Sequence, residues 1–243
     1  MDSNTYEKLK ALHLKTMASE YIHQEDIPGI TELTFDQRLT LIVDAEADAR
    51  DNTRLRNRIQ EAKFAEPGAT MEAIQYYPDR HLNKETMALL ATNKYIHKPT
   101  NILVIGATGS GKSFLACALG NRACQDNYKV RYIRMPDLFT ELELSKIENT
   151  YDKLLKRFHT RDLLIIDEWL LYPINENQRH LILEVIEGRY RYRSTIICSQ
   201  YKTDGWHEKL GGGPIADAIM DRLLPKSETI QIGGEVSMRI REN

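Results

Sequence analysis

The sequence from residue 106 reads Gly106-Ala107-Thr108-Gly109-Ser110-Gly111-Lys112-Ser113, which fits the pattern G-x-x-x-x-G-K-S. At average residue usage, chance gives such a match in about 1% of chains of this length. An apolar run at 102–105 precedes the motif, and a segment with helical periodicity at 113–121 follows it. This order predicts a phosphate-binding loop, because inward-turned backbone N–H groups and a helix N-terminus attract phosphate oxygens.

The residue types in this loop predict separate roles. Lys112 is expected to neutralise the β and γ phosphates, and the Ser113 hydroxyl is expected to bind Mg²⁺. The alternative is a glycine-rich turn that binds nothing. The predicted nucleotide-binding residues of this segment are Gly106, Ala107, Thr108, Gly109, Ser110, Gly111, Lys112, Ser113 and Phe114.

Two acidic residues follow a second apolar run about 55 residues later. Residues 163–166 are Leu-Leu-Ile-Ile, and Asp167 and Glu168 come next. Acids at the carboxyl end of a strand lie where α/β sheets bind ligands. We therefore expect Asp167 to hold Mg²⁺ through water and Glu168 to polarise the water that attacks the γ-phosphate. The alternative is a buried strand that ends in a solvated acidic turn.

A further strand, 195–199, ends in Ser199-Gln200. If it lies between the other two strands in the sheet, these polar groups reach the γ-phosphate, and Ser199 is the candidate sensor of nucleotide state. Ordinary strand-end hydrogen bonding is the alternative for Ser199.

Short β-branched runs alternate with helical stretches after residue 101, which is typical of an α/β fold with a parallel sheet. Residues 1–98 show almost no strand signal and carry helical periodicity, with a Pro28-Gly29 turn ending the first helix and Thr34 and Gln37 forming a capping box. We therefore predict a helical N-terminal region over 1–65 and an α/β domain over 66–243. The five predicted strands are 102–105, 129–134, 163–167, 195–199 and 228–232.

The composition limits the class of protein. No apolar run is long enough to cross a membrane and the first residues do not form a signal peptide, so the sequence predicts a soluble, cytoplasmic protein without a membrane partner. The three cysteines are odd in number and lack C-x-x-C spacing, and they are interpreted as buried apolar side chains. The histidines lack metal-ligand spacing, so Mg²⁺ brought by a nucleotide is the only metal expected.

Lys and Arg number 33 against 35 Asp and Glu, so the net charge gives no sign of nucleic-acid binding. DNA contact would need a local basic patch. One candidate lies in the helical segment between the second and third strands, and the arginine run 50–58 is another. A solvated helix face is the alternative for both. The DNA-binding candidates of the first patch are Lys153, Lys156, Arg157 and Arg161.

An ordered set of motifs resembles the IstB transposition helper ATPases, which are related to the DnaC helicase loaders. The resemblance covers nearly the whole chain. Two departures are the Glu168-Trp169 pair, where many members have a second aspartate and a small residue, and a slightly longer stretch at 233–237. The motifs are 101–104, the phosphate loop, 163–168, 194–200, Trp206, 218–223 and 237–239, together with 9–18 and 35–39 near the start.

The resemblance implies a AAA+ ATPase that uses ATP and Mg²⁺, assembles as a homo-oligomer on duplex DNA and assists a partner transposase in target selection and insertion. It also implies that ATP sits between subunits, with Arg222 as the arginine supplied to the neighbouring site and Arg239 as a second sensor. The alternative within this relationship is a loader of a replicative helicase on single-stranded DNA. A monomeric small-molecule kinase and a non-catalytic scaffold are less consistent with Arg222 and Glu168.

Overall fold

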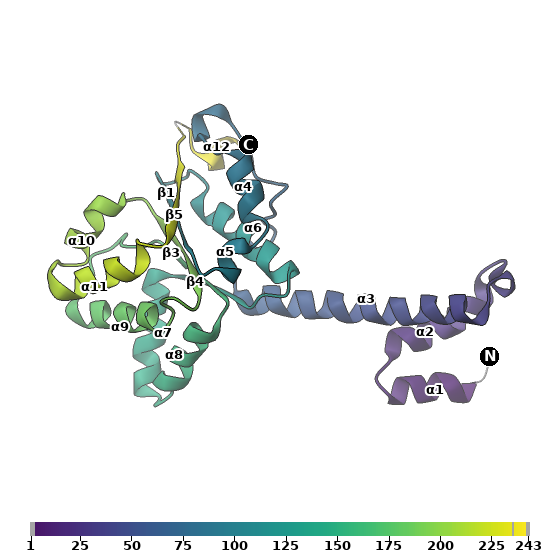
Figure 1. The fold of residues 1–243 in the computed structure, drawn as a ribbon. Helices are drawn as coiled ribbons and strands as arrows, with labels where there is room; N and C mark the ends of the chain where they lie inside the picture. Colours follow the sequence, from purple (N-terminus) through teal and green to yellow (C-terminus); the bar gives the residue numbers. More distant parts are fainter. Residues whose placement is uncertain (1–2, 235, 242–243) are drawn as a thin grey trace. The chain divides into compact units, whose positions relative to one another are not determined.

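The chain consists of two compact units, Met1–Asn57 and Arg58–Asn243. The computed structural model describes residues 3–234 and 236–241. The boundary between the units falls inside the long helix α3 (Phe35–Ala62) (Figure 1). The two units are described separately.

The first unit is helical, as the sequence predicted, but it begins with two helices instead of one. Helices α1 (Ser3–Ala11) and α2 (Lys15–His23) are separated at His13, whose φ of 60° is incompatible with a continuing helix. Two short 3-10 turns, η1 (Gln24–Asp26) and η2 (Ile30–Glu32), lead into α3. The side chain of Glu46 in α3 accepts hydrogen bonds from two N–H groups in the first turn of α2. This contact ties α2 to α3 within the unit.

The predicted capping box at the start of α3 is present. The Gln37 N–H donates to the Thr34 hydroxyl oxygen at 3.3 Å, and the Thr34 N–H donates to the Gln37 side-chain oxygen at 2.8 Å. These bonds satisfy two backbone donors at the end of the helix. Helix α3 therefore starts one residue after the predicted cap.

A five-stranded sheet forms the centre of the second unit, with strand order β2-β3-β4-β1-β5 and parallel pairing throughout. The sequence prediction of five parallel strands is confirmed, with bounds that agree within one residue. Strand β4 lies between β1 and β3, which is the arrangement that the prediction for Ser199 required. The strands are β1 (Asn101–Gly106), β2 (Val130–Arg134), β3 (Leu163–Asp167), β4 (Ser194–Ser199) and β5 (Ser227–Ile232).

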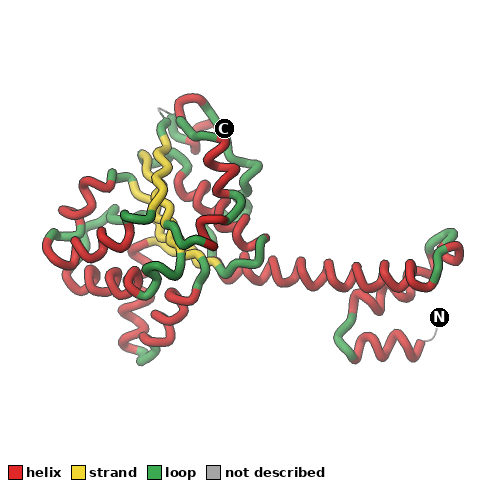
Figure 2. Tube along the Cα trace, viewed as in Figure 1, coloured by secondary structure: helices red, strands yellow, loops and turns green. Residues whose placement is uncertain are grey.

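Helices cover both faces of this sheet, so its middle strands are buried on both sides (Figures 1 and 2). On one face, Leu164 and Ile166 join a core built with side chains from α7, α9 and α11. On the other face, Ile165 approaches Gly120 of α6 so closely that a Cβ there would lie 2.9 Å from it. Successive side chains of β3 therefore pack alternately against two separate layers of helices.

The helices of the second unit connect the strands in sequence order. Before β1 come η3 (Pro78–Arg80), α4 (Lys84–Leu90) and α5 (Lys94–His97). The remaining elements are α6 (Lys112–Gln125), α7 (Met135–Ile147), α8 (Tyr151–Thr160), α9 (Glu176–Glu187), η4 (Thr203–Gly205), α10 (Trp206–Lys209), α11 (Gly213–Leu223) and α12 (Met238–Arg241).

One buried arginine holds the connection between α8, α9 and β4 together. Arg189 is 1% exposed, and its guanidinium donates to the carbonyl oxygens of Phe158, Arg161 and Ser194 and to the hydroxyl oxygen of Thr195. Burial lowers the pKa of Arg189 to about 9. These bonds replace water for both the cation and the carbonyl groups, which explains how the side chain can be buried.

We expect Arg189→Ala to lower the free energy of unfolding by about 3 kcal/mol or more, because the substitution leaves a cavity and several buried carbonyl groups without donors. Urea denaturation followed by circular dichroism measures this change. The control is Arg191→Ala two residues later, where the side chain is exposed, and a change within about 0.5 kcal/mol is expected there. Equal effects of the two substitutions would contradict the structural role of Arg189.

Candidate nucleotide site

The glycine-rich loop joins the carboxyl end of β1 to the first turn of α6. Gly109 and Gly111 have φ values of 80° and 88°, a region that residues with a Cβ rarely adopt. The Lys112 ammonium group folds back across the loop and donates to the Ala107 carbonyl oxygen at 2.8 Å. Burial lowers the pKa of Lys112, and the nearby Cys198 and Asp167 oppose this shift. The loop thus has the conformation and the cation that phosphate binding needs.

The acid pair lies two strands away at the same edge of the sheet. Asp167 is 4% exposed, and its carboxylate accepts hydrogen bonds from the Tyr132 hydroxyl and the Glu168 N–H, both at 2.7 Å. Glu168 has a φ of 55°, and its carboxylate lies 3.8 Å from Nη1 of Arg134 at the end of β2. Arg134 is in turn bound by Asp137 at 2.8 Å. The two acids therefore point to different surroundings, one buried and one beside a cation.

The two polar residues at the end of β4, Ser199 and Gln200, make different contacts. Ser199 is 1% exposed, donates to the Trp169 carbonyl oxygen at 3.1 Å and accepts from the Tyr201 N–H. Its hydroxyl is thus used within the fold. The side-chain oxygen of Gln200 accepts a hydrogen bond of 3.0 Å from the Thr108 hydroxyl in the phosphate loop. Gln200 is the residue of this pair that contacts the loop directly, although the sequence prediction selected Ser199.

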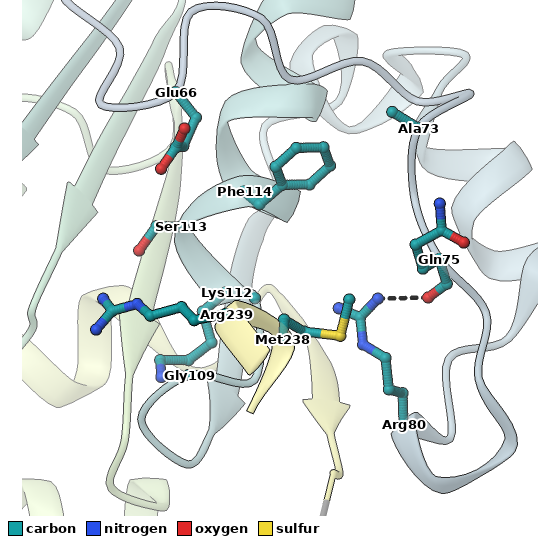
Figure 3. A pocket seen from close by; sticks show the side chains of 11 residues that line it. Glu66, Ala73, Gln75, Arg80, Gly109, Lys112, Ser113, Phe114, Met238 and Arg239 are labelled. Carbon is teal, nitrogen blue, oxygen red and sulfur yellow. Dashed lines mark hydrogen bonds between the residues drawn. The ribbon is translucent and has the colours of Figure 1, made fainter. Parts of the chain in front are cut away.

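A cavity of about 230 Å³ opens beside the loop. Three segments that lie far apart in the sequence line it: the chain before β1, the loop with the start of α6, and α12 (Figure 3). The contribution of the chain before β1 was not predicted, because that segment carries no motif. The lining residues are Glu66, Ala73, Gln75, Arg80, Gly109, Gly111, Lys112, Ser113, Phe114, Met238 and Arg239.

The two arginines with predicted roles lie at opposite ends of the sheet. The Met238 N–H donates to the Gly109 carbonyl oxygen at 2.8 Å, which brings Arg239 into the cavity (Figure 3). Arg222 lies in the last turn of α11, at the end of the sheet where β1 begins, and there the Asn101 side chain donates to the Leu223 carbonyl oxygen. The length of β1, ~17 Å for its five steps, therefore separates this end from the loop. Arg222 forms an ion pair with Glu187 and does not line the cavity beside its own loop.

The basic candidates on α8 do not share one environment. Lys153, Lys156 and Arg157 are exposed, whereas Phe158 and its apolar neighbours face the core. Arg161 is only 15% exposed in its side chain and is paired with Glu61 at 3.2 Å. Three of the four residues are thus available for an external anion, and Arg161 is engaged inside the unit.

The oxygen groups predicted to hold Mg²⁺ suit that ion. The Ser113 hydroxyl and the Asp167 carboxylate are hard oxygen donors, Ser113 in the first turn of α6 after the loop and Asp167 at the end of β3. Mg²⁺ is commonly held by one or two such groups together with phosphate oxygens. Among residues 3–234 and 236–241, no cluster of three or more His, Cys, Asp or Glu side chains forms a metal site. Within the same residues, no helix has the length and apolarity needed to cross a membrane.

Comparison with known proteins identifies the family. The family described as IstB-like ATP binding protein matches residues 7–243. The chain belongs to this family. An IstB-like relative in Sinorhizobium fredii (strain NBRC 101917 / NGR234), which bears the name insertion sequence ATP-binding protein, is 38% identical over 98% of this chain and 96% of its own length. The insertion sequence IS21 ATP-binding protein of Pseudomonas aeruginosa is 28% identical over 97% of this chain and 87% of its own.

Solved structures of other proteins share the fold of this IstB-like chain. The DnaC helicase loader is 21% identical, with a TM-score of 0.55 over 68% of this chain and 96% of the loader. DnaA from Aquifex aeolicus bound to AMPPCP is 17% identical, with a TM-score of 0.56 over 72% of this chain and 53% of DnaA. At these identities the likeness concerns the fold alone.

The three buried thiol groups of the second unit should be unreactive in the folded protein. Cys117, Cys124 and Cys198 are buried, and burial raises the pKa of Cys117 and of Cys124 to about 12 and that of Cys198 well above its usual value. Because the thiolate is the reactive form, we expect no rapid reaction with Ellman's reagent at pH 8 and three equivalents after denaturation. A rapid equivalent in the native protein would contradict the burial of these groups.

Proposed function

We propose that this protein is an ATP-dependent DNA-binding ATPase that oligomerises on duplex DNA and assists a partner transposase in target selection and insertion. The observation that carries the proposal is the convergence of the phosphate loop, Lys112 and Asp167 at one edge of the sheet beside a cavity. Membership of the IstB-like family and the names of its insertion sequence relatives support the association with transposition.

The site supports a hydrolysis mechanism built from this chain's own groups. The loop N–H groups and Lys112 bind and orient the phosphates, and Glu168 accepts a proton from the attacking water after turning from Arg134. The Ser113 hydroxyl and Asp167 would hold Mg²⁺, which supplies neutralisation of phosphate charge when bound. Gln200, fixed by Thr108, is placed to respond to the γ-phosphate, a role first proposed for Ser199.

The position of Arg222 supports a site shared between subunits. Because Arg222 lies about the length of a strand away from its own loop, it would act on the ATP of a neighbouring copy, where its charge would stabilise the phosphates in the transition state. Arg239 would act on the nucleotide of its own chain from α12. ATP would thus favour assembly, and hydrolysis would reverse it.

Two substitutions separate binding from hydrolysis. Lys112→Ala removes the cation on the phosphates, and we expect ATP affinity to fall roughly 100-fold. Glu168→Gln keeps the shape but not the base, and we expect ATP binding to persist while hydrolysis falls by about 10²-fold or more. Calorimetric titration and a phosphate-release assay measure the two effects. A Glu168→Gln protein that hydrolyses ATP at the parent rate would refute the role of Glu168.

Sedimentation with ATP or a non-hydrolysable analogue, on duplex and single-stranded DNA in parallel, tests the assembly. We expect nucleotide-dependent assembly on duplex. Preference for single strands would instead indicate a helicase loader, and a monomer indifferent to both would refute the assembly.

The basic face of α8 can be tested in the same assay. Replacement of Lys153 and Lys156 by Ala should weaken DNA binding. The slope of log K against log salt concentration should become shallower by about 2, since each phosphate contact contributes about 0.9. The control is the double replacement of Lys94 and Lys98, two exposed lysines on and just after α5. Equal losses in the two double variants would contradict a specific role for α8.

A further inference from the structure

Arg80 is a buried cation at the wall of the nucleotide cavity. It ends the turn η3 in the chain before β1 and is 4% exposed. Its Nη2 donates to the Ser110 carbonyl oxygen of the phosphate loop at 3.0 Å, and its Nη1 donates to the Gln75 carbonyl oxygen (Figure 3). The guanidinium group therefore connects the phosphate loop, through the Ser110 carbonyl group, to the segment around Gln75 that also lines the cavity.

The surrounding contacts leave this charge poorly compensated. Both bonded partners of Arg80 are carbonyl oxygens, and its Nε–H has no hydrogen-bond partner within the described part of the chain. Asp79 is the adjacent acid, but it binds Arg241 of α12, with Nη1 of Arg241 3.0 Å from Oδ1. Burial lowers the pKa of Arg80 and the nearby Arg241 adds to this shift, whereas Asp79, Tyr76 and Tyr77 oppose it without cancelling it. A buried charge with neutral partners costs stability unless another charge enters its surroundings.

The fit between Arg80 and the loop is close. A Cβ on Gly111 would lie 2.8 Å from Nη2 of Arg80. The Arg80 carbonyl oxygen accepts a hydrogen bond of 3.0 Å from the Gly233 N–H, just after β5. The backbone of Arg80 is thus held by the chain just after β5, and its side chain is held separately by the Ser110 and Gln75 carbonyl oxygens.

We propose that Arg80 is a positioning residue of the nucleotide site, which holds the phosphate loop in its binding conformation and whose buried charge is compensated by the phosphates of a bound nucleotide. This inference rests on the proposed ATP binding. It implies that Arg80 lowers the stability of the empty protein and raises the affinity for ATP and ADP. A purely structural arginine such as Arg189, whose guanidinium bonds are satisfied within the fold, would stabilise the protein whether or not a nucleotide is bound.

Arg80→Met in the full chain separates these roles, because Met fills a similar volume without charge. We expect an unchanged or higher melting temperature without nucleotide, and Kd values for ATP and ADP raised about 10- to 100-fold, as for the loss of a charged hydrogen-bonding group. Arg80→Lys keeps the charge but loses the planar fork, and an intermediate rise in Kd is expected. The control is Arg122→Met on α6, an arginine outside the cavity that donates to the Ala91 carbonyl oxygen and pairs with Asp126.

Calorimetric titration and thermal unfolding of the four proteins decide the matter. Wild-type Kd values in Arg80→Met, or a fall in melting temperature without nucleotide that matches the fall with nucleotide, would overturn the inference. If Arg80→Met does not fold, Arg80→Lys decides, since an unchanged Kd in that variant overturns the inference and a raised Kd with an unchanged melting temperature supports it. A parent protein that does not bind ATP would overturn the proposed function as well, whereas ATP binding that is lost in Lys112→Ala but unchanged in Arg80→Met would overturn the inference alone.

Discussion

The parallel pairing of β3, β4 and β1 is the constraint on which the rest of the site depends. Parallel strands bring all their carboxyl ends to one edge of a sheet, and helices on both faces leave that edge as the place where polar groups can meet a ligand. The register Val104↔Cys198 and Ile166↔Ile197 places the glycine-rich loop, the acid pair and the end of β4 together there. A different strand order would leave the same residues in the sequence without a common site.

The two most buried arginines illustrate how differently a cation can be accommodated. Arg189 lies away from the cavity, and each of its three guanidinium nitrogens donates within the fold, to three carbonyl oxygens and a hydroxyl in all. Arg80 lies at the cavity and retains an N–H group without a partner in the described residues. Because unsatisfied buried donors are costly, the first arrangement is what stability alone favours, and the second suggests that part of the compensation comes from outside the chain.

Sequence reasoning succeeded where a local pattern had a local physical cause. The β-branched runs gave all five strands, and the bonds between Thr34 and Gln37 followed from their spacing. It missed the break between α1 and α2 at His13, because the spacing of apolar residues does not reveal a single residue with a left-handed backbone. It also passed over Glu66, Gln75 and Arg80, since they belong to irregular chain before β1 and carry no motif.

The sequence by itself determined the phosphate loop, the acid pair and the parallel sheet, because each follows from residue types at fixed short spacings, and its ordered motifs carried the resemblance to the family. Only the tertiary structure decided that Gln200 instead of Ser199 bonds to the loop, that Arg222 is remote from its own site and Arg239 is not, and that Arg80 lies against Ser110. These relations join segments 30 to more than 100 residues apart. Their distances depend on how helices and loops pack around the sheet, which no local pattern encodes.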